Sequence, residues 1–324
     1  RVITVGSHKR ARMIARLFDD IKIHVSSDRG FETFTGTLRG TPISVVATGM
    51  GLPMVDMMVR EVNSCVDGTL LFLRLGTCGT PSTKVAIGTV TVNDRCVLIT
   101  RNYDGFVKAK KELKNGAKQM GKYYTISNPI PADAALSAAL ERELSKRIEK
   151  YPVVRGTGAT CDSFYGSQGR QDPWFNDHND QLIDELMEIH PESVTLEMET
   201  GHLLHLAENA ARNKIRAAGC AIVLAQRRSN DFLSKEETAF MERQAAIAVL
   251  EAIITSPLDS DDKTHARELQ QEEISKLYTS KSSAKLPSEK STFGHMAPVF
   301  SGIVTAVGCA VFGLIAWRRY RRSS

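Results

Sequence analysis

Three side chains on one short segment have the chemistry to hold a flat, polar heterocycle. Residues 161–172 place an aromatic ring at Phe164, an amide at Gln168 and a guanidinium at Arg170. The ring can lie against a planar base, the amide offers an adjacent donor and acceptor, and the guanidinium offers a rigid fork of donors for ring carbonyls. Uracil presents an edge of this kind. The same residue types are also typical of a polar surface turn, so the segment alone leaves both interpretations open.

A second segment, far away in the sequence, carries groups that bind anions. The apolar run 70–73 predicts a buried strand, and the Arg-Leu-Gly-Thr-Cys-Gly sequence over 74–79 predicts a loop at its end. In such a loop the glycines let backbone N–H groups turn toward an anion, Thr77 adds a hydroxyl, and Arg74 adds a cation suited to phosphate oxygens. A strand followed by a glycine-rich turn is common, so this segment indicates an anion site only in combination with the other segments.

A third segment lies at the start of the sequence. Residues 2–5 predict a buried strand, and residues 9–18 predict a helix with apolar side chains along one face. Gly6 and Arg10 then lie at a strand-to-helix junction, where backbone amides and the helix dipole favour an anion. Arg10 alone is also compatible with a solvated helix charge. Three separate segments that offer such groups favour one shared site.

Strand and helix patterns alternate along most of the sequence. This alternation favours an α/β fold, namely a three-layer α/β/α sandwich with a central mixed sheet and ligand groups at the strand ends. No internal repeat is present. The further expected elements are a hairpin over 32–48, a helix that begins after residue 51, strands near 85–92, 95–100, 153–160 and 219–225, and helices near 133–149, 178–189, 199–213 and 235–254.

Together with the Leu-Glu-Met-Glu-Thr sequence at 196–200, these segments resemble uridine phosphorylases of the nucleoside phosphorylase superfamily. The resemblance covers roughly residues 1–254, in the same order and with similar spacing. In that family a Gly-x-x-x-Arg turn and a strand-end Arg and Thr bind phosphate, and a further arginine comes from the neighbouring subunit. The phosphate-binding residues that the resemblance implies are Gly6, Arg10, Arg74 and Thr77, with Arg29 donated by a partner.

The resemblance also implies a nucleoside site. The Phe-Tyr-x-x-Gln-x-Arg segment contacts the nucleoside in this family, and the Glu-Met-Glu segment holds the ribose hydroxyls. The residues that inherit these roles are Phe164, Gln168, Arg170, Glu197, Met198 and Glu199, with Arg227 as a looser match that supports the pyrimidine edge. Among them, Gln168, Arg170 and Glu199 would carry the catalytic roles together with Arg74.

The activity that the resemblance implies is reversible phosphorolysis of uridine, or of deoxyuridine, to uracil and the sugar 1-phosphate, a step in pyrimidine salvage. Inorganic phosphate would be a co-substrate, no cofactor would be needed, and the borrowed Arg29 would require at least a homodimer. A purine nucleoside phosphorylase, a nucleosidase and a non-catalytic nucleoside-binding membrane protein stay open as alternatives.

The sequence departs from the family pattern near its start. Ser7 and His8 replace the usual Asp-Pro pair after the first glycine, so the turn must keep its shape by other means. In the family a histidine from an N-terminal segment reaches the ribose 5′-hydroxyl of the adjacent subunit. Residue 1 lies too close to the first strand for such a segment, so we expect this contact to lie outside the sequence.

Composition excludes several other classes of protein. The 324 residues include 42% hydrophobic and 24% charged residues, with a net charge of +5. No basic stripe with interleaved aromatic residues is present, so nucleic-acid binding is not expected. The six cysteines are scattered without CxxC pairs and are typical of reduced core thiols. His202 and His205 lack an acidic partner pattern, so no metal site is expected.

The composition changes after residue 255. We expect a domain over 1–255, a polar tether over 256–296, a candidate transmembrane helix over 297–317 and a basic tail over 318–324. The 21 uncharged residues of 297–317 match the thickness of a bilayer core. Because the thiols lack pairing motifs and no Asn-x-Ser/Thr sequence occurs, we expect a membrane-anchored enzyme facing the cytosol, with the mitochondrial outer membrane as a compatible destination.

Overall fold

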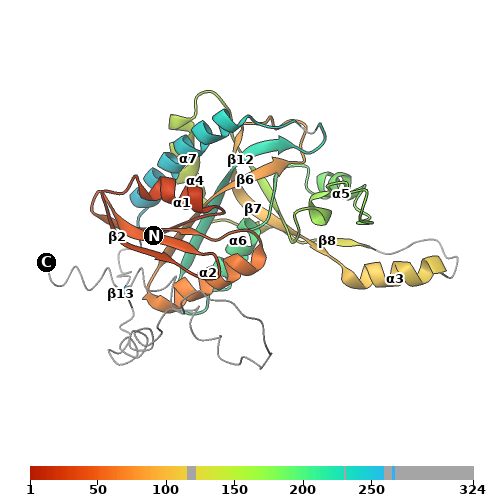
Figure 1. Ribbon diagram of the computed structural model, residues 1–324, viewed down its shortest axis with the longest axis horizontal. Coiled ribbons are helices and arrows are strands. Elements are labelled where there is room, and N and C mark those ends of the chain that lie inside the picture. Colours follow the sequence, from red (N-terminus) through yellow and green to blue (C-terminus); the bar gives the residue numbers. More distant parts are fainter. Residues whose placement is uncertain (115–121, 230, 259–264, 267–324) are drawn as a thin grey trace, which may run out of the picture.

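The protein is built around a mixed central sheet with helices on both faces (Figure 1). The computed structural model describes residues 1–114, 122–229, 231–258 and 265–266. The strands are β1 Val2–Val5, β2 Asp20–Ser26, β3 Glu32–Leu38, β4 Thr41–Ala47, β5 Val66–Asp67, β6 Leu70–Thr80, β7 Val90–Arg101, β8 Tyr124–Ile126, β9 Ile130–Pro131, β10 Val153–Cys161, β11 Ser193–Glu197, β12 Ile215–Gln226 and β13 His265–Ala266. The helices are α1 His8–Ala15, α2 Leu52–Cys65, α3 Tyr103–Lys114, α4 Ala134–Arg147, α5 Leu182–Ile189, α6 Thr200–Glu208 and α7 Lys235–Thr255, with a 3₁₀ turn η1 at Gly166–Gln168.

The sheet combines parallel and antiparallel pairs. Its strand order is β11-β10-β7-β12-β6-β1-β4-β3-β2, and β8 and β9 pair with β7. The strand β11 also pairs with β6, through Leu196 and Gly79. The five neighbouring strands β6, β12, β7, β10 and β11 therefore close into a ring. This closure brings the end of β6 next to the end of β11.

Alternating side chains on the buried strands supply two apolar cores. In β6, Leu71, Leu73 and Leu75 pack in a core under α1, α4 and α7, whereas Leu70 and Phe72 pack in a core under α2 and α6. Such alternation follows from the two-residue period of a strand. The predicted α/β/α layers with a mixed central sheet are therefore confirmed.

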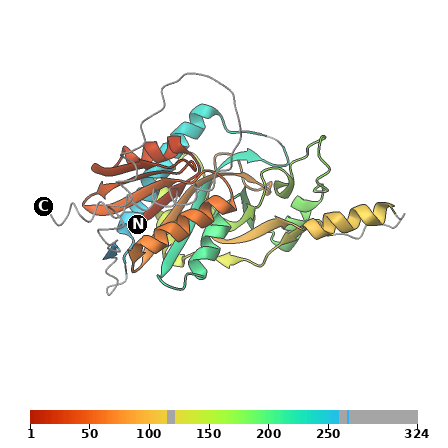
Figure 2. The ribbon, with the colours of Figure 1, turned by 60° about the horizontal axis from the view of Figure 1, so that its bottom comes forward.

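Several predicted elements differ in extent. Residues 74–79 continue β6 to Thr80 and do not form a loop, because parallel pairing with β12 runs on to Thr80 opposite Gln226. One strand, β7, replaces the two strands predicted near 85–92 and 95–100, and it begins at Val90, so residues 85–89 are not in a strand. The strand β2 and the helix α3, which extends away from the body in two views (Figures 1 and 2), were not predicted.

The prediction of a membrane-anchored protein is wrong for the part of the chain that the structure describes. Within the described ranges, no helix is both long and apolar enough to cross a bilayer. The helix α7 has 21 residues, but six of them are charged. The candidate span 297–317, the basic tail and most of the predicted tether lie outside the described residues, so the predicted division of the chain after 255 stays a prediction.

Candidate active site

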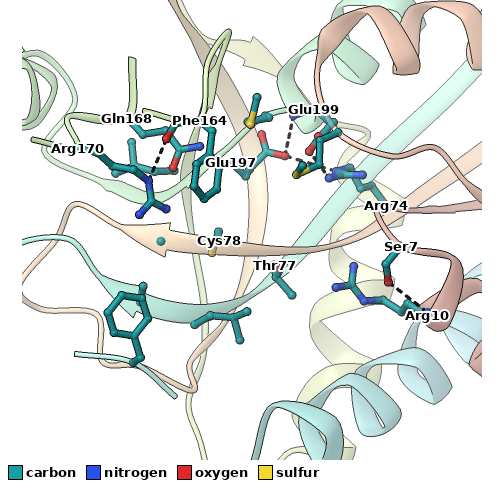
Figure 3. A pocket seen from close by; sticks show the side chains of 18 residues that line it. Ser7, Arg10, Arg74, Thr77, Cys78, Phe164, Gln168, Arg170, Glu197 and Glu199 are labelled. Carbon is teal, nitrogen blue, oxygen red and sulfur yellow. Dashed lines mark hydrogen bonds and ion pairs between the residues drawn. The ribbon is translucent and has the colours of Figure 1, made fainter. Parts of the chain in front are cut away.

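A cavity of about 360 Å³ lies where β6, β11, β12, α1 and η1 meet (Figure 3). This volume is in the usual range for a small-molecule site. Figure 3 shows Gln168 and Arg170 at one end of it, Arg10 and Ser7 at the other, and Thr77 between them. Ten of the twelve predicted site residues line the cavity, namely Gly6, Arg10, Arg74, Thr77, Phe164, Gln168, Arg170, Glu197, Met198 and Glu199.

The first turn of α1 positions Arg10. Ser7 is the N-cap residue, and its hydroxyl oxygen accepts a hydrogen bond from the backbone N–H of Arg10 at 3.2 Å. Serine is a favoured N-cap, so the turn keeps its shape without the Asp-Pro pair of the family. The Arg10 side chain is buried, with 6% of the residue exposed, and reaches the cavity.

The strand β6 positions Arg74. This residue follows Phe72 by two positions, so its side chain lies on the face that α6 covers. Its Nε donates to Glu197 at 3.4 Å and its Nη2 donates to Glu199, whereas Nη1 is buried and has no hydrogen-bond partner among the described residues. An unpartnered buried donor is costly, so this group is well placed to bind an anion.

The two arginines converge although they lie 64 positions apart in the sequence. The positive charges of both arginines lie close enough to the thiol of Cys220 in β12 to influence its pKa. Burial raises the pKa of Cys220 to about 12, and the positive charges of Arg10 and Arg74 both oppose this rise. The pair therefore supplies guanidinium groups to one end of the cavity.

Glu197 is the last residue of β11, and its carboxylate lies at the start of α6. It accepts hydrogen bonds from the backbone N–H of Glu199 at 3.0 Å and of Thr200 at 2.9 Å, and also from the hydroxyls of Thr160 and Thr200. A carboxylate at a helix N-terminus satisfies donors that have no partner within the helix. Glu197 thus fixes the backbone that carries Glu199, and it also holds Arg74.

Glu199 faces the cavity from the N-cap position of α6. One carboxylate oxygen accepts from the backbone N–H of Gly51 at 2.6 Å, and the other accepts from Arg74. Burial raises the pKa of Glu199; the charge of Arg74 opposes this rise, and the charge of Glu197 adds to it. A buried acceptor in this position is suited to bind hydroxyl donors such as those of a sugar.

At the opposite end, Arg170 and Phe164 form a stacked pair. The Arg170 guanidinium lies 4.1 Å from the centre of the Phe164 ring, and its Nε donates to the Phe164 carbonyl at 2.9 Å. Burial lowers the pKa of Arg170, but a guanidinium stays charged at neutral pH. The stacking orients the remaining N–H donors of Arg170, and the 3₁₀ turn η1 ends at Gly169, whose positive φ of 64° permits the sharp reversal.

Gln168 is buried, with 3% exposed, and is held by Arg227. The Nη2 of Arg227 donates to the Gln168 side-chain oxygen at 3.2 Å, which orients the amide. Burial, together with the nearby positive charge of Arg170, lowers the pKa of Arg227 to about 10. Arg227 therefore holds Gln168 from behind and does not itself line the cavity.

Arg29 does not line the cavity of its own chain. It is exposed on the turn between β2 and β3, and its charge acts on Glu61 of α2. The predicted role across a subunit interface therefore stays a prediction.

Sequence reasoning missed several cavity residues. Cys78, on β6, lies inside the recognised motif and could have been inferred from its position two residues after Gly76. Met50 and Phe232 also line the cavity, and Phe232 is 65% exposed. Phe232 comes from the hairpin that follows β12, where it pairs with Ala225, and no apolar periodicity marks it.

The described residues form neither a metal-binding cluster nor a disulfide. No group of three His, Cys, Asp or Glu side chains in them is arranged to hold a metal ion. The His202 side chain lies 3.4 Å from Asp56 and stacks on His205. The five described cysteines are buried and form no disulfide.

Comparison with known proteins is consistent with this geometry. Residues 1–255 match the Phosphorylase superfamily, so the chain belongs to that family. It is 28% identical to the uridine phosphorylase of Thermococcus kodakarensis over 78% of this chain and 80% of that protein, and 27% identical to a DeoD-type purine nucleoside phosphorylase of Geobacillus kaustophilus over 75% and 86%.

Solved structures agree with the fold. One of two uridine phosphorylases from the oomycete Phytophthora capsici superposes with a TM-score of 0.73 at 36% identity, over 80% of this chain and 90% of that chain. A nucleoside phosphorylase from Trypanosoma brucei shares the fold, with a TM-score of 0.63 at 20% identity, over 79% of this chain and 93% of that chain. The family match ends at residue 255, and neither it nor any described helix supports the predicted membrane anchor.

Proposed function

We propose that this protein is a uridine phosphorylase that converts uridine and inorganic phosphate to uracil and ribose 1-phosphate, without a cofactor. The observation that carries the proposal is the polarity of one cavity. Arg10 and Arg74 lie at one end, and the Gln168–Arg170 pair lies at the other (Figure 3). A dianion and a heterocycle with two carbonyls fit these two ends, with a sugar between them.

The proposed reaction separates charge as the glycosidic bond lengthens. Positive charge grows on the ribose and negative charge grows on the base, as in other glycosyl transfers with oxocarbenium character. Phosphate held by Arg10 and Arg74 is an oriented nucleophile and a counter-charge for the ribose. Gln168 and Arg170 donate hydrogen bonds to the uracil carbonyls and stabilise the departing anion, so no separate general acid is required.

Glu199 is proposed to hold the sugar. Its carboxylate oxygens are bound by Arg74 and by the backbone of Gly51, and each oxygen can accept a further hydrogen bond from a ribose hydroxyl. Met198 lines the same part of the cavity and packs against the sugar ring in this proposal. Ribose recognition and phosphate recognition are linked because Arg74 contacts Glu199 directly.

A purine nucleoside phosphorylase is the second candidate. It is favoured by the similar identity of the chain to purine-cleaving relatives. The amide and guanidinium at the base end favour a pyrimidine, because they present donors to two carbonyls. The choice between pyrimidine and purine nucleosides therefore depends on Gln168 and Arg170, because phosphate and ribose are bound in the same way in both reactions.

The test is release of free base from a panel of nucleosides, measured with and without inorganic phosphate. Uracil release from uridine that requires phosphate supports the proposal. Release of hypoxanthine from inosine at a higher kcat/KM would replace uridine by a purine substrate. Base release at the same rate in phosphate-free buffer would identify a nucleosidase, and binding without release would identify a non-catalytic nucleoside-binding protein.

A further inference from the structure

The guanidinium of Arg10 is held from behind by a carboxylate on α7. Glu242 Oε1 accepts from Arg10 Nε at 3.0 Å and lies 2.9 Å from Arg10 Nη2. On the other side, Nη1 donates to the carbonyl of Leu75 at 3.1 Å. Both side chains are largely buried, with exposed fractions of 7% for Arg10 and 14% for Glu242. The pairing joins residues 232 positions apart, from the first and the last described helix.

These contacts determine which donors of Arg10 stay available. A guanidinium has five N–H groups in a fixed plane. Glu242 binds the N–H groups of Nε and Nη2 along one edge of the guanidinium, and the Leu75 carbonyl accepts one N–H of Nη1. One N–H on Nη1 and one on Nη2 remain, on the two nitrogens that form the end of the guanidinium. Such a pair can bind two oxygens of one phosphate.

We infer that Glu242 is a positioning residue for phosphate: it orients Arg10 so that this end-on pair of donors faces the cavity. The inference rests on the proposed function, because it takes the anion to be the phosphate co-substrate. Glu242 acts only through Arg10 and does not line the cavity. Its negative charge alone would weaken phosphate binding, so the benefit must come from the geometry that its oxygen imposes on Arg10.

Two substitutions separate geometry from charge. Glu242→Ala removes the acceptor and lets Arg10 move, whereas Glu242→Gln keeps an acceptor oxygen in the same place and removes the charge. Glu251→Ala is a matched control, because Glu251 lies on the same helix and pairs with Arg39 and Arg147 away from the cavity. Thermal melting of each variant shows whether it folds.

The experiment measures KM for phosphate and KM for uridine separately. For Glu242→Ala we expect the phosphate KM to rise at least about tenfold while the uridine KM changes by less than about twofold. For Glu242→Gln and for Glu251→Ala we expect a phosphate KM within about threefold of the wild type. A phosphate KM that is unchanged or lower in Glu242→Ala overturns the inference, as does an equal rise in both KM values or a Gln variant that matches the Ala variant.

A second readout keeps this test independent of the proposed function. Calorimetric titration with inorganic phosphate measures binding to each variant without any nucleoside. If the wild type releases no base from uridine, the proposed function fails, but weaker phosphate binding in Glu242→Ala than in Glu242→Gln still supports the role of Glu242. Equal phosphate binding by the three folded variants and the wild type rejects it.

Discussion

Replacing Arg170 by alanine tests the base end of the cavity most directly. Its Nε is used by the Phe164 carbonyl, and the ring of Phe164 fixes the guanidinium plane, so the Nη donors are oriented before substrate binds. Loss of a preorganised donor to a developing anion costs about 2 to 4 kcal/mol of transition-state stabilisation, or a factor of about 30 to 900 in kcat/KM. The Arg170 side chain is half-buried, which favours the lower part of this range.

The assay is initial-rate uracil release at varied uridine and varied phosphate. We expect Arg170→Ala to lose kcat/KM for uridine and to keep the phosphate KM, because Arg10 and Arg74 lie at the other end of the cavity. Arg170→Lys keeps the charge but loses the planar fork and the stacking, so its rate should fall between those of the wild type and Arg170→Ala. A near-wild-type rate for the alanine variant, or a loss of phosphate affinity instead, would refute the assigned role.

Two further predictions concern residues outside the cavity. Co-expression of Arg29→Ala with Arg170→Ala should restore about a quarter of the wild-type rate if Arg29 acts across a two-fold interface, since half of the dimers are mixed and each has one intact site; no recovery beyond either variant alone argues for a role within one chain. The second prediction concerns Glu32. Burial tends to raise the pKa of Glu32, but hydrogen bonds from Arg12 and His24 outweigh this effect and hold the pKa below its usual value. Glu32→Gln should therefore lower the free energy of unfolding by about 1 to 2 kcal/mol at pH 7, and the difference should shrink as the pH falls below about 4.3, the usual pKa of glutamate; a difference that persists in acid would contradict this.

The convergence of the site could be predicted because each motif keeps its chemistry within a few residues. Phe164, Gln168 and Arg170 need only one turn to share a face, and the chain supplies it at η1. Likewise, Arg10 needs only the first turn of α1. Buried parallel strands carry such groups to one edge of a sheet, so three segments with ligand-binding groups favoured a shared site, and the resemblance to nucleoside phosphorylases implied their roles.

The parts that were missed depend on partners that are distant in sequence. The strand β6 continues through its glycines because β12 offers backbone partners up to Gln226, which no local pattern reveals. The strand β7 looked interrupted because its pairing with β10 shifts by one residue between Asn93 and Arg95, so the apolar alternation changes phase there. The role of Glu242 is equally hidden, because its partner lies at the other end of the domain.

The charge around Arg10 and Arg74 is the reason to expect that a second chain completes the proposed phosphate site. Among the described residues in contact there, Arg10 and Arg74 face three carboxylates, those of Glu197, Glu199 and Glu242. A dianion therefore needs either a proton on one carboxylate or another cation. Burial raises the pKa of Glu199, but a protonated Glu199 would lose acceptor capacity for the ribose hydroxyls. A fixed positive charge from a second chain avoids this conflict, so we expect phosphate binding to depend on a dimer that brings Arg29 to the neighbouring cavity.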